Sequence, residues 1–116
     1  MFEFQSLEVY KKAVLFHLNC KMILGKQKLA KYINDQLGRA SYSIVLNIEE
    51  GCAKSSKADR KNYFTTSRGS VFECVAILDI MHQSKDLDEE KYLENLKLAD
   101  ELSRTLYKMI SNVSNP

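Results

Sequence analysis

The residues from Gln36 to Gly51 repeat their apolar side chains at the spacing of an α-helix. At about 3.6 residues per turn, one stripe is apolar and consists of Ile33, Leu37, Ala40, Ile44 and Ile48. A polar stripe runs along its edge and consists of Gln36, Arg39, Ser43, Asn47 and Glu50. Polar groups beside a core must be hydrogen-bonded wherever they are buried, because their desolvation is otherwise unfavourable. The segment therefore predicts a packed helix with an ordered polar edge.

Residues that would interrupt long helices are scarce. The 116 residues include four glycines and one proline, and the proline is the last residue, Pro116. Apolar residues recur at helical spacing in four segments, at about 6–24, 29–53, 57–84 and 88–113, and no strand-like alternation of useful length competes with them. The links between these segments are short, which makes neighbouring helices antiparallel. We therefore predict an all-α fold, an antiparallel up-down-up-down four-helix bundle, in which residues 1–116 form a single domain.

The spacing also predicts which side of each helix faces the core. For the first helix the expected core residues are Leu7, Tyr10, Val14, Leu18 and Met22. For the third they are Phe64, Val71, Val75 and Leu78, with Ser67, Cys74 and Met81 at one edge. For the fourth they are Leu93, Leu96, Ala99, Leu102 or Ser103, Leu106, Met109 or Ile110, and Val113.

Glycine and capping residues mark positions within and between these helices. Gly38 lies inside the second helix, where glycine costs about 1 kcal/mol relative to alanine, so we expect a neighbouring helix to approach closely there. Gly51 marks the end of that helix or a tight contact. Ser56 and Asp59 form a plausible capping pair for the third helix, and Asp86 and Asp88 start the fourth.

Charge is distributed unevenly along the chain. The net charge is +2, but residues 1–68 carry twelve Lys/Arg and six Asp/Glu, whereas residues 69–116 carry five and nine. Basic side chains gather around the turn between the second and third helices, with Tyr63 interleaved, and these are Lys54, Lys57, Arg60, Lys61 and Arg68. Such a cluster is typical of phosphate contact with RNA or DNA. It is equally typical of a solvated helix end, and both interpretations stay open.

The polar edge of the second helix invites two interpretations. Together with Glu73 it forms a seam that consists of Arg39, Ser43, Asn47, Glu50 and Glu73. A catalytic group is one interpretation, but a structural network that fixes the register of the helices is favoured, because no histidine joins the seam. We therefore predict no catalytic residues.

Metal and thiol chemistry are also not indicated. Asp79 and His82 resemble one half of a carboxylate-bridged di-iron site, but no second half accompanies them. Cys20, Cys52 and Cys74 are widely spaced and form no metal-binding motif, so free thiols are expected. We expect no metal and no cofactor.

Several apolar side chains face away from the predicted core. Tyr42, Val45 and Leu46 do so on the second helix, and much of the third helix is apolar all round. We predict that such residues form the interface of a homo-oligomer, and the candidates are Tyr42, Leu46, Phe72, Ile77 and Ile80. The sequence contains neither a membrane-spanning run nor a signal peptide, so no membrane partner is expected and the cytoplasm is the expected location.

At these residues the chain resembles a known family, the 23S rRNA intervening-sequence proteins. The matching positions near the start are Leu7, Val9, Tyr10 and Ala13. In the second helix they are Gln36, Leu37, Arg39, Ala40, Ser43, Ile44, Asn47, Ile48, Glu50 and Gly51. In the third they are Tyr63, Phe64, Gly69, Ser70 and Glu73.

The resemblance implies a small antiparallel bundle that assembles into a ring, with a pentamer favoured. Relatives include an accessory protein of diversity-generating retroelements that binds a reverse transcriptase and nucleic acid, whereas most members have no established biochemical activity. The family often has an arginine three residues after the glycine that matches Gly51, but Lys54 stands there in this chain. Lysine lacks the bidentate geometry of arginine toward phosphate.

Two functions remain as expectations. The first is a non-enzymatic oligomeric scaffold that contacts RNA or DNA through the basic turn, with a protein partner left open. The alternative is a self-assembling protein–protein interaction module with no nucleic-acid role.

Overall fold

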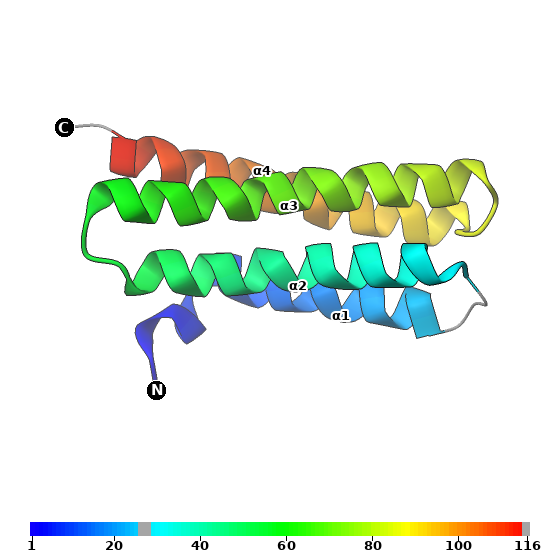
Figure 1. Ribbon diagram of the computed structural model, residues 1–116, viewed down its shortest axis with the longest axis horizontal. Helices are drawn as coiled ribbons and strands as arrows, with labels where there is room; N and C mark the ends of the chain where they lie inside the picture. Colours follow the sequence, from blue (N-terminus) through cyan, green and yellow to red (C-terminus); the bar gives the residue numbers. More distant parts are fainter. Residues whose placement is uncertain (26–28, 115–116) are drawn as a thin grey trace.

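Four antiparallel helices make up most of the described part of the chain (Figure 1). The computed structural model describes residues 1–25 and 29–114. A short 3₁₀ turn, η1 (Glu3–Ser6), precedes α1 (Glu8–Gly25), α2 (Lys31–Ala53), α3 (Lys57–Gln83) and α4 (Glu89–Ser114). Each helix packs against the next, and α4 packs back onto α1. The predicted all-α four-helix bundle is confirmed, and its dimensions are 46 × 27 × 22 Å.

Side-chain caps set the ends of the two longest helices. The Ser56 hydroxyl accepts a hydrogen bond of 3.1 Å from the Asp59 N–H at the start of α3. At the start of α4, the Asp88 carboxylate accepts one of 2.8 Å from the Lys91 N–H. These bonds satisfy amide groups that a helix leaves unpaired in its first turn. The α2–α3 and α3–α4 links are short, so neighbouring helices run antiparallel.

The predicted core stripe of α2 is confirmed. Leu37, Ile44 and Ile48 are fully buried, and Ala40 is nearly so. These side chains meet a continuous core from the other helices, whose largest members include Phe16, Phe64, Leu78, Met81, Leu102 and Leu106. On α3, Ser67, Cys74 and Met81 belong to this core and not to its edge, whereas Val75 is only half-buried.

The predicted core face of α1 is wrong at three of its five positions, whereas Tyr10 and Val14 are half-buried and pack against the core. Leu7, Leu18 and Met22 are exposed, whereas the buried residues are Val9, Ala13, Phe16, Cys20 and Ile23. Both sets have helical spacing, because α1 is apolar on two sides. The buried set places the large Phe16 ring in the core beside the small Ala13. The exposed residues Leu18 and Met22 form an apolar strip on the outside of α1.

The predicted core face of α4 is wrong at its first position. Leu93 is 54% exposed, and Asn95 is buried in its place. The Asn95 amide donates to the carbonyl oxygen of Lys91 at 2.9 Å, one turn earlier in the same helix. This bond pairs the Asn95 NH₂ group and so lowers the free-energy cost of burying the side chain. Asn95 Oδ1 has no hydrogen-bond partner among the described residues. Ala99, Leu102 and Leu106 are buried as expected.

The two glycines of α2 have different environments. A Cβ added at Gly51 would lie 2.7 Å from Phe64 Cδ1 and would overlap another atom of that buried ring. Gly51 therefore marks the predicted tight contact, between α2 and α3. The close approach predicted at Gly38 is wrong, because an added Cβ there would meet Leu24 Cδ1 at an ordinary 3.9 Å among the described residues.

We expect Gly51→Ala to lower the free energy of unfolding by about 1–3 kcal/mol, because overpacking displaces the Phe64 ring. Gly38→Ala is the matched control, and it should raise the free energy of unfolding by about 0.5–1 kcal/mol, because alanine favours the helix. Urea denaturation followed by circular dichroism measures both. Equal stabilities of the two variants would contradict the tight contact.

Candidate functional site

Four of the five predicted basic residues lie together at one end of the bundle. Lys54 belongs to the α2–α3 link, and Lys57, Arg60 and Lys61 belong to the first turns of α3. We call these four residues the basic turn. The N-terminal segment and the end of α4 lie at the same end of the bundle (Figure 1). The N-terminus of a long helix adds a positive partial charge at this place.

Two members of the basic turn also hold the turn in shape. The Lys54 ammonium lies 3.6 Å from the Glu50 carboxylate and 5.3 Å from the centre of the Tyr63 ring. The Arg60 guanidinium donates to the Lys54 carbonyl oxygen at 3.3 Å. The side chains of Lys57 and Lys61 are exposed. Their exposure makes these two lysines accessible to a ligand.

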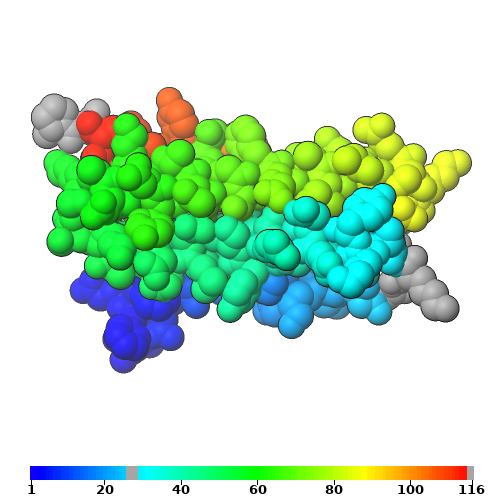
Figure 2. Space-filling model, viewed as in Figure 1, coloured from blue at the N-terminus to red at the C-terminus, as the bar shows by residue number. Residues whose placement is uncertain are grey.

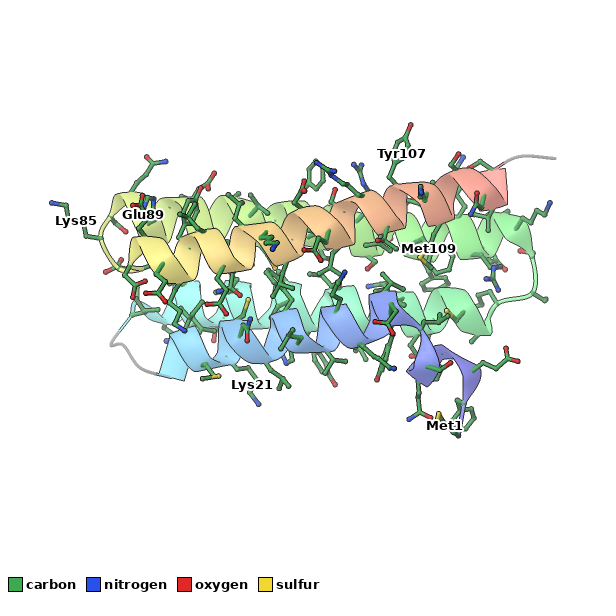
Figure 3. All side chains as sticks on the ribbon, turned by 180° about the vertical axis from the view of Figure 1, so that it is seen from behind. Met1, Lys21, Lys85, Glu89, Tyr107 and Met109 are labelled. Carbon is green, nitrogen blue, oxygen red and sulfur yellow. The ribbon has the colours of Figure 1, made fainter. Side chains whose placement is uncertain are left out.

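Arg68 lies apart from the basic turn. Its Nε donates to the backbone carbonyl oxygen of Ser103 in α4 at 3.1 Å. Its guanidinium also lies 4.8 Å from the Phe72 ring centre and 5.3 Å from that of Tyr107. Tyr107 projects outward from α4 (Figure 3). Arg68 therefore ties α3 to α4, a position that its sequence spacing from the other basic residues did not reveal.

We expect Arg68→Met to lower the free energy of unfolding by about 1–2 kcal/mol, because the variant loses a charged hydrogen bond and contact with two rings. Arg104→Met is the matched control. Arg104 is exposed and pairs with Asp100 one turn away, so its loss should cost less than about 0.5 kcal/mol. Thermal and chemical denaturation compare the two variants, and equal losses would contradict a tie between α3 and α4.

The polar edge of α2 forms hydrogen bonds with α3. The Asn47 amide donates to the carbonyl oxygen and the hydroxyl of Ser43, at 2.9 and 3.0 Å. Across the helix pair, the Ser70 hydroxyl donates to the Ser43 hydroxyl at 2.9 Å. The Ser67 hydroxyl donates to the Ile44 carbonyl oxygen at 2.8 Å. The bonds of Ser67 and Ser70 connect α2 and α3, whereas the bonds of Asn47 lie within α2.

The other predicted members of the seam lie outside this network. Glu50 pairs with Lys54. Arg39 and Glu73 are exposed, and neither forms an ion pair within residues 1–25 and 29–114. The seam's role as a register-fixing network stays a prediction. Ser70 was missed by sequence reasoning, although it follows Ser67 by three residues and so shares its side of the helix.

Four of the five candidate interface residues are exposed, and they lie on two sides of the bundle. Tyr42, Leu46, Phe72 and Ile80 are between 41% and 63% exposed. Tyr42 contacts the His17 ring of α1, whereas Phe72 lies toward α4. Ile77 is half-buried against the core. Val45, which was expected to face outward, is buried. It lies one turn after Ser41, whose hydroxyl contacts His17 of α1.

An apolar groove follows the outer contact between α3 and α4. Its volume is about 620 Å³, and its apolar lining consists of Val71, Phe72, Val75, Leu93, Leu96 and Ala99. Lys97, Asp100 and Ser103 form the rest of the lining. Sequence reasoning missed the groove because it assigned Leu93 to the core. An exposed apolar groove of this kind is typical of a protein interaction surface.

The thiols of Cys20 and Cys74 are buried, and that of Cys52 is partly buried. Burial raises the pKa of the Cys20 thiol to about 12, and burial also raises the pKa of Cys74. A thiol with a raised pKa is a poor nucleophile at neutral pH. Burial raises the pKa of Cys52 as well, although the nearby Arg60 opposes that shift.

Asp79 and His82 both interact with Tyr92. The Tyr92 hydroxyl donates to Asp79 Oδ1 at 2.5 Å, and the His82 ring stacks on the Tyr92 ring with centres 4.2 Å apart. No cluster of three potential ligands for a metal ion occurs in the described part of the chain. Within that same part, no helix has the length and apolar character needed to span a bilayer.

Comparison with known proteins identifies the family. Residues 5–108 match the family model of the 23S rRNA-intervening sequence protein. The chain belongs to this family. A crystal structure of a protein of unknown function from the S23 ribosomal protein family of Bacteroides thetaiotaomicron has the same fold. The two share 23% sequence identity and a TM-score of 0.81, over 88% of this chain and 97% of that chain. No curated protein matches the chain.

Proposed function

We propose that this member of the family is a non-enzymatic oligomeric scaffold that contacts RNA or DNA through the basic turn. The observation that supports the proposal is the gathering of Lys54, Lys57, Arg60 and Lys61 around the N-terminus of α3. Ammonium and guanidinium groups beside a helix N-terminus attract phosphate, and this attraction depends on salt and not on base sequence.

Oligomerisation would strengthen the attraction of the basic turn for phosphate, because the positive charge of one copy is small. Residues 50–61 carry four positive and two negative side chains, an excess of two, and Glu3 and Glu49 beside Arg60 reduce that excess further. A symmetric ring repeats that excess along one rim, where a nucleic-acid strand can follow several copies at once. The family resemblance favours a pentamer.

Self-association has its own support in the exposed apolar side chains. Phe72 and Leu93 are each more than half exposed and line the groove between α3 and α4. Covering such a groove with a second copy removes apolar surface from water and stabilises the assembly. The same groove supports the alternative function, a self-assembling protein–protein interaction module with no nucleic-acid role.

The contacts of His17 and Ser41, a histidine and serine pair that could resemble a catalytic pair, support a non-enzymatic function. His17 Nδ1 lies 2.8 Å from the Ser41 hydroxyl, and that hydroxyl donates to the Gly38 carbonyl oxygen. Ser41 is fully buried, so this serine and histidine pair connects α1 to α2 beyond the reach of a substrate. Burial lowers the pKa of His17, and the charge of Lys21 lowers it further.

We expect the double variant Lys57→Glu/Lys61→Glu to bind a short duplex DNA and a short RNA at least about tenfold more weakly than the unaltered protein. If each lysine neutralises one phosphate, the slope of log K against log salt should fall by about 2 for the duplex. Fluorescence anisotropy over a salt series measures both quantities. Arg60 stays unaltered, because it also bonds the turn.

Lys21→Glu provides the control for a change of charge alone. Lys21 projects from α1, away from the basic turn (Figure 3), so its reversal should change the affinity less than about twofold. Two outcomes would contradict the proposal. One is undetectable binding by the unaltered protein at low salt, which would leave the interaction module as the function. The other is an equal effect of both charge reversals, which would mean that net charge and not the turn governs binding.

A further inference from the structure

A hollow lies beside the basic turn, where the N-terminal segment crosses the end of α2. Its volume is about 690 Å³, and its lining consists of Phe2, Glu3, Phe4, Leu7, Glu49, Cys52, Ala53 and Arg60. Figure 2 shows the N-terminal segment projecting from this end of the molecule. The N-terminal segment and the α2–α3 region, which are distant from each other in sequence, therefore build the hollow, and Arg60 belongs both to it and to the basic turn.

Aromatic rings form one wall of the hollow. The Phe2 and Phe4 rings are stacked with centres 6.1 Å apart, and Phe4 packs edge-on against Tyr10 at 5.0 Å. Phe2 is 73% exposed. Its backbone is nevertheless held, because the Phe2 N–H donates to Gln5 Oε1 at 2.8 Å. An ordered ring that remains open to solvent is a stacking surface for another planar group.

Charged groups of both signs complete the hollow. Glu3 and Glu49 carry carboxylates, and Arg60 carries the one positive side chain of the lining. Burial raises the pKa of the Cys52 thiol, Arg60 lowers it and Glu49 raises it, so both charges act at the floor of the hollow. The carboxylates repel a phosphate group inside the hollow, whereas they accept hydrogen bonds from amino groups. The basic turn outside attracts phosphate.

We propose that the hollow receives an unpaired base of a single-stranded nucleic acid whose phosphates lie on the basic turn. The base stacks on Phe2, and the Glu49 carboxylate accepts a hydrogen bond from the amino group of cytosine or adenine. A base within a duplex is stacked and paired, so it cannot enter. This inference rests on the proposed function and adds to it a preference for single strands that carry amino-bearing bases.

The test compares oligonucleotides with the same phosphates but different bases. We expect the unaltered protein to bind an oligocytidine about tenfold more tightly than an abasic strand of equal length, because a base that stacks on an aromatic ring strengthens binding. An oligouridine, which lacks the amino group, should bind with intermediate affinity. Phe2→Ala should reduce the affinity for oligocytidine to the abasic level and leave the abasic affinity unchanged.

Three further variants make the result specific. Phe2→Tyr keeps the ring and should retain the tight binding of oligocytidine. Glu49→Met should remove the preference for oligocytidine over oligouridine. Tyr32→Ala removes a ring that is 71% exposed at the start of α2, at the opposite end of the bundle, and it should have no effect.

Three results would overturn the inference. Equal binding of base-bearing and abasic strands would do so while the proposed function stands, because the phosphates would still be bound. Absence of binding to either strand would overturn both. A lower oligomer mass for Phe2→Ala in light scattering would mean that a second copy of the chain fills the hollow.

Discussion

The contact between α2 and α3 is the interaction on which the rest of the structure depends. Ser67 and Ser70 are small enough to let the helices approach, and each donates a hydrogen bond across the contact. Gly51 admits the Phe64 ring near the end of the pair. Larger side chains at these positions would push the helices apart, because a packed interior has little free volume. The serine hydroxyls also satisfy one another and a backbone carbonyl, so their burial carries no large penalty.

This contact determines what lies at one end of the bundle. Because α2 and α3 are held together up to Gly51 and Phe64, the link between them is short and turns sharply. The basic side chains are thereby concentrated at a helix N-terminus, and η1 packs beside them (Figure 1). The proposed phosphate surface and the aromatic hollow are both consequences of this arrangement. The apolar groove between α3 and α4 lies along the side of the bundle and leaves that end open.

How much the sequence could predict differs from helix to helix, for physical reasons. The core stripe of α2 was predictable because a polar stripe runs along its edge, although Val45 was placed on the wrong side. The core face of α1 was not, because both its faces are apolar and only the neighbouring helices decide between them. Asn95 was unexpected because a buried amide depends on a local bond to its own helix. In these cases tertiary packing overrides periodicity.

The candidate site also contains residues whose proximity was predictable from the sequence and residues whose contacts were not. Residues of the basic turn are close in sequence, so their proximity was predictable. Arg68 follows only seven residues after Lys61, yet its contacts are with α4, and nothing in a linear pattern indicates such a partner. The hollow combines η1, the end of α2 and the start of α3. Because η1 lies far in sequence from the α2–α3 region, a site that joins them becomes visible only when the chain is folded.

The most direct measurement is light scattering with absorbance detection on the purified protein mixed with a short RNA at low salt. It reports the mass of the assembly and the amount of bound nucleic acid together. The account predicts a mass several times the 13.4 kDa of one chain, about 67 kDa for a pentamer, with RNA eluting in the same peak and leaving it as salt is raised. A 13.4 kDa monomer that elutes without RNA would contradict it.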